Sequence, residues 1–303
     1  MHSLGVMSRL ANGFLKATQI GCALYRFNTL RIASHVFSNV SPEVVSRAFF
    51  GRTLYVDTKR GNPQRLLYLE GERFIEERSI IRRLVRPGLR AVDVGANIGY
   101  YALMLADQIG PGSQVICIEP EPENLVELRR NIEANHLTNV TVLAAAAGAE
   151  DGHAELLRGI NGQVVPLGHG EIRVRTLALD SLADGAIGFI KIDVEGYELE
   201  VLRGARNLIS RHRPNLFIEV HPQFQLEPDG VVQVMRLILE YYPGAVAYTR
   251  RTSTVVHKIG QRYFGRPVFR SSPVDMSFAQ YPQIFWIACS RDCLADGARR
   301  SVA

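Results

Sequence analysis

Four side chains that can take up a proton or bind a cation follow two apolar runs in the second half of the chain. The runs are Gly188–Val194 and Asn215–Val220, and the side chains at their ends are those of Asp193, Glu195, Glu219 and His221. We expect both runs to be buried parallel strands, because such strands are apolar on both faces. Parallel strands end at the same edge of a sheet, so the sequence predicts that these side chains crowd together there.

Such a cluster has two chemical uses. It can remove the proton from an attacking hydroxyl group, for which His221 is the first candidate base and Asp193 the second. Alternatively, carboxylates and a histidine hold a divalent cation, which lowers the pKa of the hydroxyl and orients it. The divalent cation stays an open alternative at this point, and the sequence assigns no residue to it.

An interpretation without a ligand is also open for the acids after the first run. Glu195 and Glu198 lie just before a predicted helix, Leu199–Ile209. Acids at this position stabilise the N-terminus of a helix. On this interpretation they also pair with Lys191 or Arg203.

A glycine-containing turn earlier in the chain offers a ligand site. The stretch Arg90–Tyr101 predicts a buried strand, a tight turn and a helix start, and its candidate binding residues are Asp93, Gly95, Asn97, Gly99 and Tyr100. Glycine lets the backbone approach a ligand where a Cβ would clash. Asn97 breaks the G-x-G-x-x-G pattern typical of dinucleotide sites, which disfavours a nicotinamide dehydrogenase. An acid two residues before the first glycine suits a ligand with a positive amino group, and the alternative is a structural turn without a ligand.

The next two predicted strands would complete such a site. The run Gln114–Ile118 ends at Glu119, which is placed to accept hydrogen bonds from two ribose hydroxyls and also to cap the predicted helix Glu123–Asn135. The third strand, Val140–Ala147, ends in alanines. We therefore expect backbone groups and apolar packing around Ala147 to hold an adenine ring.

Other segments predict elements around this core. Amphipathic helices are expected at Phe74–Val85 and Val231–Tyr242, and late strands at Ala245–Tyr248 and Gln283–Ala288. The turn-rich stretch 159–170 and the alternating stretch 171–179 predict an insertion over the site, either a lid or a substrate contact. The long connection 249–281 is expected to select the substrate.

Composition limits the class of protein. The 303 residues are 47% hydrophobic and carry a net charge of +5, which is too modest and too dispersed for a nucleic-acid footprint. The four cysteines lack the spacing of a zinc site. We expect reduced thiols and a cytoplasmic setting.

The first 42 residues contain no acid but several basic and regularly spaced apolar residues. We expect a helical extension that packs on the catalytic domain or on a second subunit. The alternative is a basic amphipathic helix resting on an anionic membrane surface. No uncharged run in this segment reaches transmembrane length.

Four segments together resemble one protein family. They are VDVGANIGYYA (Val92–Ala102), IEPEPENLVELRRNI (Ile118–Ile132), IKIDVEGYELEVLRGA (Ile190–Ala205) and FIEVH (Phe217–His221). This combination resembles the FkbM family of class I S-adenosylmethionine-dependent methyltransferases. The resemblance covers roughly residues 74–222, and residues 1–71 carry none.

The resemblance implies an α/β fold. We expect the Rossmann-like seven-stranded sheet of class I methyltransferases, with an antiparallel last strand and flanking helices. The expected division is an N-terminal extension over residues 1–71, helical and then short strands, a methyltransferase domain over 72–290 and a tail over 291–303.

The resemblance also implies roles for the candidate residues. S-adenosyl-L-methionine would be the cofactor, with its methionine part held by Asp93, Gly95, Asn97 and Gly99. Glu119 would hold the ribose, and Asp193 with its neighbours would face the transferred methyl group. The implied reaction is O-methylation of a hydroxyl on a sugar, a glycan or a secondary metabolite. A methyltransferase of a lipid-linked glycan at the membrane, and an inactive cofactor-binding partner subunit, are the alternatives.

Overall fold

A computed structural model describes residues 43–60, 64–65, 67–68, 75–157, 162–182, 185–250 and 269–291. The chain divides into two compact units, residues 1–76 with 250–269 and residues 77–249 with 270–303. The expected helices of the first 42 residues, the tail over 292–303 and most of the 249–281 connection lie outside the described residues.

The first unit contains a β-hairpin. Strands β1 (Val44–Phe49) and β2 (Arg52–Asp57) pair antiparallel, with Phe49 opposite Arg52. Phe50 and Gly51 between them have φ angles of 54° and 79°, as a two-residue hairpin turn of the I′ type requires. The sequence predicted short strands and turns in this region.

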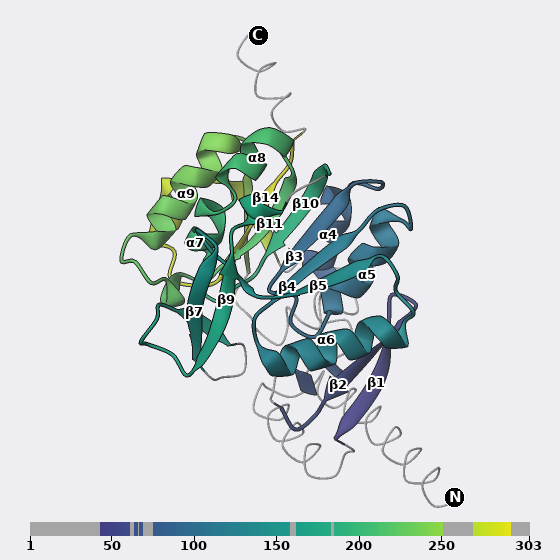
Figure 1. Cartoon of the computed structure of the whole chain (residues 1–303). Helices are drawn as coiled ribbons and strands as arrows, with labels where there is room; N and C mark the ends of the chain where they lie inside the picture. The colour runs from purple at the N-terminus through teal and green to yellow at the C-terminus, as the bar shows by residue number, and fades with distance from the viewer. Residues whose placement is uncertain are drawn as a thin grey trace, which may run out of the picture. The chain divides into compact units, whose positions relative to one another are not determined.

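The second unit is built on an eight-stranded sheet (Figure 1), whose order is β13-β12-β14-β11-β10-β3-β4-β5. Its strands are β3 (Arg90–Val94), β4 (Val115–Glu119), β5 (Val140–Ala144), β10 (Ile187–Ile192), β11 (Asn215–Val220), β12 (Val246–Arg250), β13 (Phe269–Pro273) and β14 (Phe285–Cys289). Strands β3, β4, β5, β10 and β11 run parallel, and β14 is antiparallel to both β11 and β12.

This order confirms the predicted seven-stranded sheet with an antiparallel last strand, and it adds one edge strand. The additional strand, β13, comes from the 249–281 connection, which the sequence analysis treated as a loop. Its residues FRSSP do not alternate strongly between apolar and polar, and most of them are exposed. An exposed edge strand therefore gives little signal in the hydrophobic pattern.

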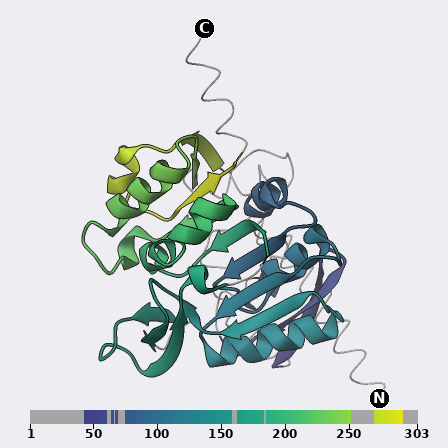
Figure 2. The same ribbon diagram turned by 45° about the horizontal axis from the view of Figure 1, so that its top comes forward.

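Helices cover both faces of this sheet (Figure 2). They are α4 (Ile75–Leu84), α5 (Tyr100–Ile109), α6 (Pro122–Ala134), α7 (Glu198–Arg203), α8 (Arg206–His212) and α9 (Gly230–Tyr241). The amphipathic helix predicted at Phe74–Val85 corresponds to α4, in which Ile80, Ile81 and Leu84 are buried whereas Ile75 is 41% exposed. Within the part of the chain that the structure describes, no helix has the length and apolar character needed to cross a membrane.

The helix predicted at Leu199–Ile209 is in fact two helices, α7 and α8, which are separated at Gly204 and Ala205. A Cβ on Gly204 would lie 1.9 Å from the carbonyl oxygen of Gly148. The helix is interrupted where the backbone of Gly204 lies close to that of Gly148. Helical periodicity in the sequence does not reveal such a contact.

The main core lies on one face of the sheet. Aliphatic residues of β3, β10 and β11 pack there with α7, α8 and α9, and they include Val92, Val94, Ile190, Ile192, Ile218 and Val220. Because side chains alternate along a strand, Asp93, Lys191 and Glu219 point to the opposite face. Tyr101 of α5 contacts Lys191 on that face.

A second, four-stranded sheet has the order β6-β9-β7-β8. Its strands are β6 (Ala146–Ala147), β7 (Gly152–Leu157), β8 (Gln163–Val165) and β9 (Ile172–Leu177). The predicted third strand is therefore divided at Ala145 between two sheets, and β7 was not predicted. The side chain of Gln163 donates a hydrogen bond to the carbonyl oxygen of Phe224 (3.2 Å). This contact joins the inserted sheet to the segment that follows His221.

Candidate active site

The glycine turn after β3 packs against the end of β10. Gly95 has a φ of +75°, and a Cβ there would lie 1.9 Å from the carbonyl oxygen of Asp193. Gly99 has a φ of +93°, and a Cβ there would lie 2.9 Å from the side chain of Leu128. The sequence assigned these glycines to a close ligand approach. The structure shows that the protein's own packing already requires them.

Asp93 has a partner that the sequence analysis did not assign to it. Its carboxylate is completely buried, and Lys191 Nζ lies 3.3 Å from its Oδ1. The same ammonium lies 3.3 Å from Asp193 Oδ2 and 3.4 Å from the carbonyl oxygen of Gly95. Burial raises the pKa of Asp93, and Lys191 opposes that rise. A contact between Asp93 and a ligand's amino group stays a prediction, since Lys191 already provides a positive charge there.

Lys191 is itself almost fully buried. Burial lowers the pKa of a lysine, but the carboxylates of Asp193, Asp93 and Glu219 outweigh this effect and raise the pKa of Lys191. The ring of Tyr101 lies beneath the ammonium, with its centroid 5.0 Å from Nζ. Lys191 therefore stays charged and holds the end of β3, the turn and the end of β10 together.

Glu119 supports the glycine turn from the end of β4. Its Oε2 accepts a hydrogen bond from the backbone N–H of Asn97 (2.8 Å). Its Oε1 accepts from the N–H of Glu121 (3.0 Å) and from the side chain of Asn124 (3.1 Å). Burial raises the pKa of Glu119, and these hydrogen bonds oppose the rise. The carboxylate thus lies at the turn, and its contact with a ribose stays a prediction.

Two further candidates are buried. Tyr100 begins α5, and its ring meets that of Tyr101 edge-on at 5.0 Å. Ala147 is 3% exposed and pairs with Leu177 of β9 in the inserted sheet. These contacts are all within the protein, so the predicted roles of Tyr100 and Ala147 in cofactor binding stay predictions.

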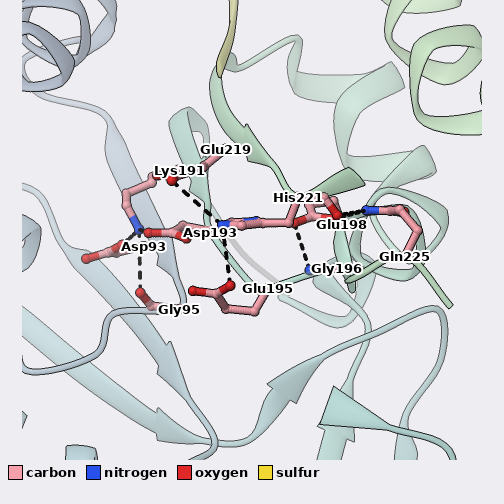
Figure 3. Close-up of polar contacts among 10 residues, drawn as sticks. All are labelled: Asp93, Gly95, Lys191, Asp193, Glu195, Gly196, Glu198, Glu219, His221 and Gln225. Atoms are coloured by element: carbon pink, nitrogen blue, oxygen red, sulfur yellow. Dashed lines mark hydrogen bonds and ion pairs between the residues drawn. The ribbon is translucent and has the colours of Figure 1, made fainter. Parts of the chain in front are cut away.

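The four residues of the acidic cluster, Asp193, Glu195, Glu219 and His221, do meet at the ends of β10 and β11 (Figure 3). Nε2 of His221 lies 3.5 Å from Glu195 Oε2, 3.7 Å from Glu219 Oε1 and 4.0 Å from Asp193 Oδ1. Register explains the meeting, because Lys191 pairs with Phe217 and Ile192 with Ile218. The next residues on both strands therefore project at the same edge.

A further residue, Glu198, completes the cluster and was not assigned to it from the sequence. Its Oε1 lies 2.7 Å from His221 Nδ1 and accepts from the N–H of Gly196 (3.0 Å). Its Oε2 accepts a hydrogen bond from the side chain of Gln225. Glu198 is completely buried. Since an ionised carboxylate only accepts, Nδ1 carries a proton and Nε2 faces the other acids.

The sequence interpretation that paired Glu195 and Glu198 with Lys191 or Arg203 is wrong for Glu198. Arg203 is bonded instead to Glu200 and Glu227. An acid in the first turn of an amphipathic helix usually faces solvent. Here Glu198 is buried, and its partner is His221, which lies 23 residues later in the chain. Periodicity carries no signal for such a long-range polar contact.

The cluster holds its histidine as a cation. Burial lowers the pKa of His221, but the hydrogen bond that Nδ1 donates to Glu198 and the charges of Asp193, Glu198 and Glu219 raise it to about 10. Burial, assisted by Asp193, raises the pKa of Glu219. At neutral pH the ligand-free His221 is therefore protonated on both nitrogens, and it cannot act as a base until that proton is displaced.

The backbone at this edge is also unusual. Glu195 has a φ of +49°, in the left-handed region that few residues other than glycine adopt. At the next residue, Gly196, a Cβ would lie 2.1 Å from the carbonyl oxygen of Phe224. Such conformations persist where surrounding structure enforces them, and they are frequent at functional sites.

The comparison with family models covers this whole arrangement. Residues 93–242 match the model of the methyltransferase FkbM domain. The chain contains an FkbM methyltransferase domain. Every residue of the glycine turn, the lysine contact and the acidic cluster lies within the matched segment. The main sheet has the class I methyltransferase fold, extended by β13.

Two curated proteins are similar to parts of this chain. Hexuronic acid methyltransferase AglP of Haloferax volcanii is 27% identical over 150 residues, which are 47% of this chain and 59% of that protein. Protein-L-isoaspartate O-methyltransferase of Methanothrix thermoacetophila is 34% identical over 59 residues, 20% of this chain and 28% of that protein. The matches thus span less than two thirds of either relative.

A solved structure is similar as well. It is the crystal structure of methyltransferase FkbM from Methylobacillus flagellatus KT, with 22% sequence identity and a TM-score of 0.43. The match covers 74% of this chain and 52% of that chain.

Proposed function

We propose that this protein transfers a methyl group from S-adenosylmethionine to a hydroxyl group of a sugar or a related small molecule. The FkbM domain supports methyl transfer. One observation carries the choice of a hydroxyl acceptor, namely the convergence of Asp193, Glu195 and Glu219 on His221 beside the glycine turn. A hydroxyl must lose its proton during methylation, and such a cluster can take it up. The partial similarity to a hexuronic acid methyltransferase favours a sugar.

The chain's residues fit this cofactor at two points. Helix α5 begins after Gly99 without a side-chain cap and without an acid in its first turn. Its N-terminus therefore suits the carboxylate of a methionine group. The carboxylates at the ends of β10 and β11 suit a sulfonium cation. When bound, the cofactor supplies an electrophilic methyl group.

Glu195 is our candidate for the proton acceptor. His221 was the first candidate from the sequence, but it already holds a proton in the ligand-free state. Asp193, the second, is bound to Lys191. The carboxylate of Glu195 lies 3.5 Å from His221 Nε2, and the side chain is 21% exposed, so an acceptor can reach it. His221, held by Glu198, then stabilises the negative charge that develops.

An acceptor panel tests the proposal. The full chain is incubated with S-adenosylmethionine carrying a trideuterated methyl group and with neutral sugars or hexuronic acids, and the products are weighed by mass spectrometry. We expect transfer to a hydroxyl, giving an ether that survives mild base. Transfer to a carboxylate gives an ester that mild base removes, and this result, or no transfer to any acceptor, would contradict the proposal.

Two variants test the role of Glu195. Glu195→Gln should lower turnover by ~10²–10⁴-fold, the usual contribution of general base catalysis. Glu240→Gln is the matched control, because Glu240 is an exposed acid of α9. If the two variants turn over equally, Glu195 is not the proton acceptor.

A further inference from the structure

We propose that Asp193, Glu219 and His221 bind a divalent cation, which holds the acceptor hydroxyl. This inference rests on the proposed methyl transfer and adds a metal site to it. One ligand atom from each of the three residues can be chosen so that all lie within 4.8 Å of one another. Metal–ligand distances of about 2.0–2.2 Å place neighbouring ligand atoms roughly 3–4 Å apart. The observed separations of 3.7 and 4.0 Å from His221 Nε2 are close to this range.

The histidine provides an observation that an acidic cluster alone would not. The side chain of His221 is only 2% exposed, and its Nδ1 is fixed by the fully buried Glu198. Nε2 therefore points into the carboxylates, at the distances of 3.5–4.0 Å given above. Histidines that bind metals commonly donate their second ring N–H to a carboxylate, which fixes the ring for coordination. The Glu198–His221 pair has this arrangement.

The two oxygens of Asp193 face different partners. Oδ2 lies 3.3 Å from Lys191 Nζ, whereas Oδ1 is the oxygen nearest His221. Lys191 thus fixes the carboxylate from one side and leaves Oδ1 directed toward the cluster. The ammonium does not need to move for Asp193 to coordinate a cation.

The charges at this edge also favour a cation. Asp193, Glu195 and Glu219 surround Nε2, and the buried Glu198 lies behind the ring. Lys191 is engaged with Asp93 and Asp193 on the far side. A divalent ion that displaces the Nε2 proton of His221 would offset the negative charge of these carboxylates.

Such a site has a defined use in methyl transfer. Three protein ligands leave coordination positions open for the acceptor, and two adjacent oxygens of a sugar can fill them. The bound hydroxyl gives its proton to Glu195. The hydroxyl oxygen then forms a bond to the methyl carbon while the carbon–sulfur bond of the cofactor breaks. The sulfur keeps the electron pair and becomes a neutral thioether. Carboxylate ligands suit Mg²⁺ and Mn²⁺, and the imidazole favours a transition metal such as Mn²⁺ over Mg²⁺.

The test uses the full chain after treatment with a chelator and its removal by desalting. Mn²⁺ is added in steps, and the free ion is measured by electron paramagnetic resonance. We expect saturable binding of about one Mn²⁺ per chain. Glu219→Gln and Asp193→Asn should weaken binding by at least 10-fold, and Glu240→Gln should leave it unchanged. The amide variants keep side-chain size, and circular dichroism confirms their folding.

His221→Asn separates a coordination site from a mere acidic surface. A site that uses the imidazole loses at least 10-fold in Mn²⁺ affinity when His221 is replaced. A diffuse acidic surface keeps or gains affinity, and that result would overturn the proposal, as would a wild-type chain that does not bind Mn²⁺ saturably.

A parallel titration with S-adenosylhomocysteine distinguishes this proposal from the proposed function. Binding of the adenosyl ligand without Mn²⁺ binding overturns the cation site and leaves methyl transfer intact. Binding of Mn²⁺ without the adenosyl ligand supports the cation site and contradicts the assigned cofactor.

Discussion

Oε1 of Glu198 lies 2.7 Å from Nδ1 of His221, and both side chains are buried. Glu198 is the first residue of α7, and His221 directly follows β11. The contact fixes the orientation of the imidazole relative to three other carboxylates. It is the reason that a histidine at a strand end points into the cluster.

Replacing Glu198 with glutamine should impair turnover without impairing cofactor binding. Glu198 holds His221 but lies behind it, so we expect kcat/KM for methyl transfer to fall by ~10–100-fold, as for other residues that orient a site histidine. The affinity for S-adenosylhomocysteine should stay unchanged. Glu200→Gln, on the same helix, is the control, because its partly exposed pair with Arg203 contributes little. Equal kcat/KM values for the two variants would contradict the orienting role.

The titration of His221 can be followed by nuclear magnetic resonance of the metal-free protein. Its neighbouring carboxylates favour the charged ring, and its pKa should be about 10. In Glu198→Gln the pKa should fall to about 9 or below, because a hydrogen bond to a charged group contributes ~1.5–3 kcal/mol and one pKa unit is ~1.4 kcal/mol. A midpoint near 6.5 in the wild type would show that the acids do not act on this ring.

The Asp93–Lys191 pair should be necessary for stability. Lys191→Met leaves the carboxylate of Asp93 buried without its ion-pair partner. Breaking such a pair costs ~3–5 kcal/mol of unfolding free energy. Asp93→Asn combined with Lys191→Met should recover at least ~1 kcal/mol of that loss, as measured by urea unfolding.

The loss in Lys191→Met should also depend on pH. Burial raises the pKa of Asp93 in the folded state, and in Lys191→Met the charge of Lys191 no longer opposes that rise. The folded variant therefore keeps a proton on Asp93 at pH values where the unfolded chain has released it. Stability then falls as pH rises, and the deficit relative to wild type should be larger at pH 8 than at pH 5. A deficit that shrinks with rising pH would exclude Asp93 as its source.

The glycine turn can be tested with two alanine variants. Gly95 and Gly88 have φ angles of +75° and +79°, but only Gly95 has a protein atom at the Cβ position. Gly88→Ala should cost ~1–2 kcal/mol for the left-handed backbone alone. Gly95→Ala should cost at least ~1 kcal/mol more and weaken adenosyl binding, because Asp193 must move. Similar losses in both variants would mean that the close approach is not important.

The sequence was sufficient to predict seven of the eight strands of the main sheet, whose arrangement the family resemblance implied, and the meeting of the four cluster residues. Continuous apolar runs identify buried strands, and parallel strands end at a common edge, so Asp193 and Glu219 could be placed together. Strand β11 matched its predicted range, Asn215–Val220.

What the sequence did not predict depends on long-range contacts. The partner of His221, the engagement of Lys191 with Asp93, and the break between α7 and α8 each arise from segments far apart in the chain. From the sequence, Lys191 lay within the apolar run Gly188–Val194 and was considered only as a partner of Glu195 or Glu198. Its position opposite Asp93 becomes evident only from the pairing of β10 with β3.

The most direct test of the central claim is calorimetric titration of the wild-type chain with S-adenosylhomocysteine and, separately, with NAD. We expect the adenosyl ligand to bind at one site per chain and NAD not to bind. Binding of NAD alone, or of neither ligand, would contradict the assignment of the glycine turn and the β10–β11 edge to S-adenosylmethionine.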